Sequence, residues 1–95
     1  MSVVFEVTKD PSAILDYGFD WTAWLGADTV STSSWSVSSG SGLVITSTAV
    51  DSSNKKTVVW LAGGNLGGIY TVSNLITTVA GRQDSRSFSV TVLSR

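Results

Sequence analysis

Short segments in which apolar and polar residues alternate recur about every ten residues along this chain, separated by turns rich in Gly, Ser or Asn. Side chains that alternate with a period of two point to opposite faces of a β-strand, so each segment is typical of a strand with one buried side. Seven such strands predict an all-β fold, an antiparallel β-sandwich. We expect residues 1–95 to form one domain of this kind.

The predicted strands cover most of the chain: Ser2–Thr8, Leu15–Asp20, Val30–Val37, Leu43–Ala49, Lys55–Ala62 and the two arms of a hairpin that turns at Ala80-Gly81. Between the second and third strands, Asp20–Leu25 predicts a single helical turn that plugs one end of the sandwich, because Trp21 and Trp24 are three apart. The stretches Ser38–Gly42 and Gly63–Gly68 predict turns between strands.

The predicted core consists of the inward-facing residues of these strands: Leu15, Tyr17, Phe19, Trp35, Trp60, Tyr70, Val72, Phe88 and Val90. Tyr70 begins a long strand just after a glycine-rich turn. In immunoglobulin-like sandwiches a tyrosine at this corner folds back to hydrogen-bond an upstream carbonyl, and a buried phenol needs such a partner. The pattern therefore predicts an immunoglobulin-like sandwich of about seven strands.

Histidine and cysteine are absent from the chain. This excludes imidazole acid–base chemistry, thiolate nucleophiles, disulfides and zinc sites built on these residues. Asp16 and Asp20 share one strand face, but about 13 Å of backbone separates them, more than the carboxylate pair of a glycosidase requires. Gly63–Gly68 lacks the Lys-Ser/Thr of a phosphate-binding loop. We expect no catalytic residue, no metal site and no cofactor, and therefore no enzyme.

Charge and hydropathy also limit the partners. The longest apolar segment is Val58–Ala62, far short of the ~20 residues of a membrane span, and Met1–Thr8 does not have the pattern of a secretory signal. Residues 1–51 carry six acidic side chains and one lysine, whereas residues 52–95 carry five basic side chains and one aspartate. These scattered cations do not form a nucleic-acid footprint. Either the two halves face each other within the fold, or their charges order neighbouring copies or partners.

Four tryptophans in 95 residues leave several interpretations open. Trp35 and Trp60 are predicted to be core residues while Trp21 and Trp24 cap one end. An exposed tryptophan would instead stack on sugar rings, as in a carbohydrate-binding module, or anchor a protein interface.

Several short blocks of residues, spread in consistent order along nearly the whole chain, match those of one protein family. They are Lys9-Asp10-Pro11, Leu15–Trp21, Trp24–Thr29, Ser34–Val37, Val59–Gly64, Gly67, Tyr70–Val72, Thr77-Thr78, Gly81-Arg82 and Asp84–Phe88 with Val90 and Val92. In these blocks the chain resembles the phage fiber–tail adaptor-like family, small immunoglobulin-like virion proteins of tailed bacteriophages.

The resemblance implies a structural virion protein, present in several copies in the tail or the head–tail neck and assembled in the cytoplasm of the bacterial host. It would link a head–tail connector or tail-tube protein to a fiber or tailspike, and it would bind neither nucleic acid nor membrane. The alternatives are a capsid or tail decoration that binds carbohydrate through Trp21, Trp24 and Gly63–Gly68, and a head–tail completion protein.

Two sets of residues are candidates for contact with partners. The strands Ser2–Thr8 and Ser87–Ser94 are expected at sheet edges, where an incoming strand can satisfy unpaired backbone groups. The candidate interface residues are Val3, Phe5, Val7, Trp21, Trp24, Asn65, Leu66, Arg82 and Arg86.

Overall fold

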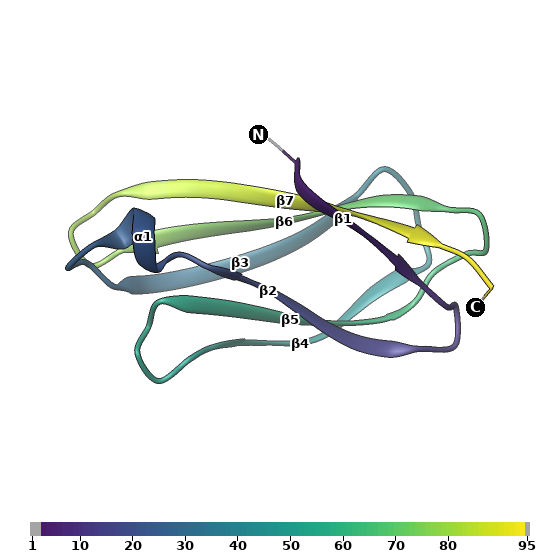
Figure 1. Ribbon diagram of the computed structural model, residues 1–95, viewed down its shortest axis with the longest axis horizontal. Helices are drawn as coiled ribbons and strands as arrows, with labels where there is room; N and C mark the ends of the chain where they lie inside the picture. Colours follow the sequence, from purple (N-terminus) through teal and green to yellow (C-terminus); the bar gives the residue numbers. More distant parts are fainter. Residues whose placement is uncertain (1–2, 95) are drawn as a thin grey trace.

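The computed structural model describes residues 3–94, with side chains from residue 5 onward (Figure 1). Seven strands and one short helix follow one another in the order β1 (Val3–Lys9), β2 (Ile14–Asp20), α1 (Thr22–Leu25), β3 (Val30–Ser38), β4 (Leu43–Val50), β5 (Lys56–Gly63), β6 (Ile69–Thr78) and β7 (Gln83–Val92). The predicted all-β fold is confirmed, and each predicted strand corresponds to one of these seven.

The strands form two sheets, one with the order β1-β7-β6-β3 and the other with the order β2-β5-β4. The second, fourth and fifth strands are thus separated from the third, sixth and seventh, which is the division of an immunoglobulin-like sandwich. The first strand differs from the constant-type pattern because it joins the sheet of β7.

The pairing of β1 with β7 is parallel, whereas every other pairing among the described strands is antiparallel. In consequence β1 lies at a sheet edge, as expected, but the expectation that Ser87–Ser94 lies at an edge is wrong, since β7 runs between β1 and β6. Residue alternation shows that a segment is extended, but it does not show which strand will pair with it.

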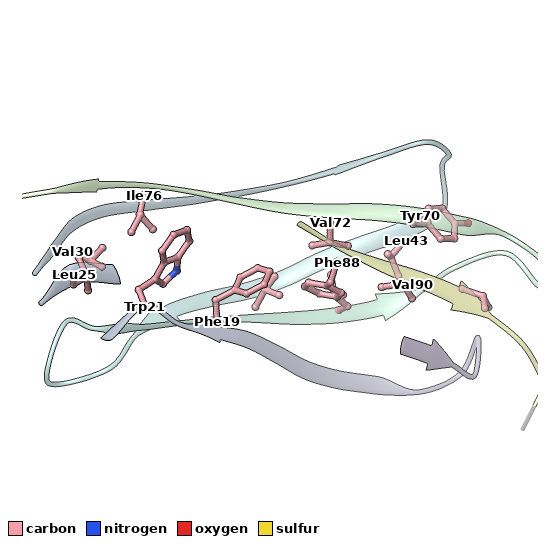
Figure 2. Packing of buried hydrophobic residues seen from close by; sticks show 13 residues of the cluster. Phe19, Trp21, Leu25, Val30, Leu43, Tyr70, Val72, Ile76, Phe88 and Val90 are labelled. Carbon is pink, nitrogen blue, oxygen red and sulfur yellow. The ribbon is translucent and has the colours of Figure 1, made fainter. Parts of the chain in front are cut away.

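One continuous core fills the space between the sheets (Figure 2). Trp21, Leu25 and Val30 lie at one end of this cluster, and Leu43 and Tyr70 lie at the other. The middle is aromatic: the rings of Phe19 and Phe88 meet edge to face at 5.9 Å, and the half-buried rings of Tyr17 and Trp35 pack against them. Side chains of the two sheets therefore interdigitate in one layer.

Two residues that we predicted in the core lie outside it. Trp60 is 39% exposed, because Thr57, Val59 and Leu61 are the residues of β5 that point inward and Trp60 follows the opposite alternation. Leu15 is 37% exposed, since it is the second residue of β2 and lies close to the end of that strand.

Tyr70 forms the corner predicted for it. Its side chain is 2% exposed, and its hydroxyl donates a 2.6 Å hydrogen bond to the carbonyl of Ser41. The same oxygen accepts a 2.9 Å hydrogen bond from the backbone N–H of Asn65. The phenol thereby joins the turn before β4 to the turn before β6, and the expected upstream carbonyl partner is confirmed.

Candidate functional site

The end of the sandwich that carries α1 is organised by Arg82. Its Nε lies 3.2 Å from the Asp28 carboxylate, and its Nη2 donates a 2.9 Å hydrogen bond to the carbonyl of Leu25. Its guanidinium carbon also lies 4.4 Å from the centroid of the Trp24 ring. This planar side chain holds the end of α1, the following loop and the β6–β7 turn in one arrangement. We call this end, residues 21–29 with 79–82, the α1 tip.

Local sequence explains why the chain turns here. The Asp20 carboxylate accepts hydrogen bonds from both the backbone N–H and the hydroxyl of Thr22, the first residue of α1. Trp21 occupies the N-cap position, so Asp20 lies one residue before it. Gly26 ends the turn with a φ of 61°, a conformation that favours glycine, and its N–H bonds the carbonyl of Thr22. The predicted single turn between the second and third strands is therefore confirmed.

Asp28 supplies the negative charge of the α1 tip. It accepts hydrogen bonds from the backbone N–H groups of Thr29 and Ala80, at 2.9 and 3.2 Å. Hydrogen bonding to the Thr78 hydroxyl, followed by these amides and Arg82, lowers the pKa of Asp28 to about 2. The carboxylate is therefore ionised at neutral pH. Its contact with Arg82 joins the acidic first half of the chain to the basic second half.

Trp21, which we proposed as an interface residue, is fully buried. Its Nε1–H donates to the hydroxyl of Thr57 and to the amide oxygen of Asn74, at 3.2 and 3.1 Å. The guanidinium of Arg86 covers its ring at 4.1 Å. The candidates Trp21, Trp24 and Arg82 thus come together in the α1 tip, and Arg86 of β7 packs against it. Trp21 serves as the internal support of the tip, because its indole N–H has partners only inside the fold.

The opposite end of the molecule is formed by Gly63–Gly68 and its neighbours, which we call the loop tip (Figure 1). The side-chain amide of Asn65 donates to the carbonyl of Ser41, so this candidate residue holds the loop in place. Leu66 is 65% exposed and Ile69, just beyond the loop, is 60% exposed. The loop tip is a fixed backbone that presents apolar side chains outward.

The candidates on β1 do not form an outward surface. Phe5 stacks on Phe88 with ring centroids 4.8 Å apart, and both Phe5 and Val7 pack against the core as half-buried residues. Their alternation places them on the inner face of the edge strand. The side chain of Val3 lies outside the described residues.

The outer face of the three-stranded sheet carries an apolar surface that none of the candidate interface residues belongs to. Ile14, Ala62 and Val44 are neighbours across β2, β5 and β4, and Ile14 and Val44 are 61% and 54% exposed. Trp60 lies next along β5, between Asp16 and Ser47. Its signal in the sequence was the continuous apolar run Val58-Val59-Trp60-Leu61, which is typical of a strand covered on both faces.

The described residues do not bring together the sugar-binding surface expected as an alternative. Among residues 3–94 there is no pocket and no group of three carboxylates that could hold a metal ion. The proposed sugar site would need Trp21 and Trp24 beside Gly63–Gly68, but the structure places them at opposite ends of the sandwich (Figure 1). The one helix found in the described part of the chain, α1, is too short to cross a membrane.

Comparison with known proteins identifies one family. The model of the family Gp77, described as "Podophage GP4 fiber-tail adaptor protein gp77", matches residues 9–91 of the 95-residue chain. A search of curated proteins finds no match. The matched range includes the α1 tip, the loop tip and the strands β2 to β6, with all of β7 but its last residue, whereas of β1 it includes only Lys9.

Proposed function

This chain belongs to the podophage GP4 fiber-tail adaptor family and has a structural role in the phage tail, and we propose that it links the tail or the head–tail connector to a fiber or tailspike through its two tips. The tail assembly would form in the cytoplasm of the bacterial host. In this function each of the two tips binds a different partner.

The observation that supports this proposal is the separation of the two tips. The molecule measures 42 × 24 × 18 Å, and the α1 tip and the loop tip lie at the two ends of its longest axis (Figure 1). Each tip presents an apolar side chain to solvent, Val79 at the α1 tip with 72% exposure and Leu66 at the loop tip with 65%. An adaptor needs two surfaces that are far enough apart for two partners to bind without colliding.

Both tips are also held rigid, as a mechanical linker requires. At the α1 tip, Arg82 binds Asp28 and the carbonyl of Leu25. At the loop tip, buried Lys9 donates to the carbonyl of Gly63 at 2.7 Å, and Tyr70 bonds two turns. Surfaces that are ordered before binding lose little conformational entropy on assembly.

Complementation of a phage that lacks this gene tests the proposal. Val79→Asp and Leu66→Asp each place a charge on an exposed apolar side chain of one tip, so neither change should affect the fold. For a linker, one variant should fail to enter the particle, whereas the other should be incorporated while the fiber or tailspike is lost. Protein analysis of purified particles and infectivity measure the two losses separately.

Ser36→Asp is the matched control, because Ser36 is an exposed residue on β3 between the tips. It should leave incorporation and fiber content at the wild-type level. Incorporation of both tip variants with a full complement of fibers would contradict the linker function. If both variants fail to enter the particle, or if loss of the chain leaves the fiber attached, a head–tail completion function is supported instead.

A further inference from the structure

The free edge of β4 carries no charged residue and no proline, two of the features that usually prevent an edge from pairing with another strand. β4 pairs with β5 on one side, and no other described strand pairs with it on the other. Residues Val30–Val50, which include all of β4, contain no charged side chain and no proline. Charged residues and proline are two of the devices that keep edge strands from pairing, and β4 has neither.

The hydrogen bonds of β5 show which backbone groups of β4 face outward. The N–H of Trp21 bonds the carbonyl of Lys55, so the odd-numbered residues of β5 bond β2. The N–H of Asp51 bonds the carbonyl of Lys56, so the even-numbered ones bond β4. By this alternation Val44, Ser47 and Ala49 bond β5. The N–H and C=O groups of the alternating residues point to the free edge, and these are Leu43, Ile45, Thr48 and Val50.

This outward pattern is not that of a regular strand. The register of β4 shifts between Ile45 and Ser47, which marks a bulge at Thr46. The outward-facing residues Ile45 and Thr48 are consequently three positions apart, whereas a regular strand presents such groups every second residue. A bulge of this kind hinders pairing with a regular strand but matches a strand that has the same interruption.

We propose that β4 pairs in antiparallel orientation with β4 of a second copy of this chain. Leu43 then lies opposite Val50 and Ile45 lies opposite Thr48, and each pair exchanges both of its backbone hydrogen bonds. The bulges of the two copies lie opposite each other at the two-fold axis. Such a contact is isologous, because the same strand contributes to both sides of it.

The side chains agree with this register. Val44 and Ala49 both lie on the outer face, paired with Ala62 and Val58 of β5, and the register places them opposite each other across the two copies. No like charges meet, because β4 has no charged residue. By contrast, β2 would bring Asp16 and Asp20 of two copies close together.

Disulfide trapping tests the register directly, and the absence of native cysteine removes any background. Val44 and Ala49 would form a pair without mutual hydrogen bonds, with Cα atoms about 4.5 Å apart, within the range of a disulfide. We expect a mixture of Val44→Cys and Ala49→Cys chains to give a cross-linked dimer under mild oxidation. Each variant alone should cross-link far less, since two copies of residue 44, or of residue 49, would lie far apart.

Charge complementation tests the same contact without a covalent bond. Ser47 is exposed and near the proposed two-fold axis, so Ser47→Asp and Ser47→Lys should each prevent dimerisation, while an equimolar mixture should restore it. Sedimentation velocity should show the wild-type mass doubling from 10.0 kDa as the concentration rises to the millimolar range. Ser36→Asp and Ser36→Lys on β3, the other uncharged edge, should not alter the mass.

The proposal is overturned if the wild-type chain stays monomeric over this range. It is also overturned if the cysteine variants cross-link to the same extent in every combination. The β4 contact does not depend on the adaptor function. A monomeric chain could still link a tail to a fiber through its tips, so the particle experiments and these experiments fail independently.

Discussion

The hydroxyl of Tyr70 donates a hydrogen bond to the carbonyl of Ser41, 29 residues earlier in the chain. Ser41 lies in the turn between β3 and β4, whereas Tyr70 lies in β6. One phenol therefore fixes the turn between the sheets at the loop tip, and the N–H of Asn65 bonds to the same oxygen.

Removing this hydroxyl should loosen the loop tip without disturbing the core. Tyr70→Phe leaves the ring in place but deprives the Ser41 carbonyl and the Asn65 N–H of their partner, and we expect a loss of about 1–3 kcal/mol in the free energy of unfolding. Urea unfolding followed by tryptophan fluorescence measures it. Ile69→Ala, at a neighbouring residue that is 60% exposed, is the control and should change stability little. Equal stability of Tyr70→Phe and wild type would contradict the bonding described.

Substitution by phenylalanine should destabilise the fold at Trp21 but have little effect at Trp60. Trp21→Phe removes an indole N–H that bonds Thr57 and Asn74 inside the core, and it leaves a cavity, so a loss of about 2–4 kcal/mol is expected. Trp60→Phe changes a side chain on the outer face of the sheet and should stay within about 0.5 kcal/mol of wild type. Thermal or urea unfolding compares the two. The reverse order would show that Trp60 is the core residue.

Acid should destabilise the fold through Asp28 and Asp51. The Thr78 hydroxyl at Asp28, and the Ser53 hydroxyl at Asp51, are the main causes that lower each pKa from 3.8 to about 2. A carboxylate whose pKa is lower in the folded state stabilises the fold above its unfolded pKa, and that stability is lost as protons bind. The melting temperature should therefore fall as the pH decreases from about 4 to 2.

Asp28→Asn is the matched test of this pH dependence. The amide cannot be protonated in this range, so the variant should lose stability at neutral pH and show a shallower decline between about pH 4 and 2. A decline as steep as that of wild type would assign the acid sensitivity to other groups.

Gly18 should not tolerate a methyl group. A Cβ atom built at this position lies 2.3 Å from the backbone carbonyl oxygen of Thr57, and β2 and β5 would have to separate to admit it. We expect Gly18→Ala to cost roughly 1–3 kcal/mol, as overpacking does, and denaturant unfolding measures the cost. A variant as stable as wild type would show that the two strands can move apart freely.

The sequence alone determined the strands and several of their faces. In β6 and β7 the residues Tyr70, Val72, Phe88 and Val90 alternate with polar residues, and all of them are buried as predicted. The corner at Tyr70 could also be predicted, because a buried phenol requires a partner and a glycine-rich turn precedes it. Such features depend on neighbours in the chain, so local pattern is enough to find them.

Only the tertiary structure decided which faces are covered and which strands meet. Trp60 lies in an apolar run of β5, but the outer face of that strand remains uncovered within the chain, whereas Trp21 lies between the sheets. The parallel pairing of β1 with β7, and the bulge that gives β4 its unusual edge, likewise follow from contacts between distant segments. A period of two assigns side chains to two faces, but burial of either face depends on what packs against it, and that is a property of the whole fold.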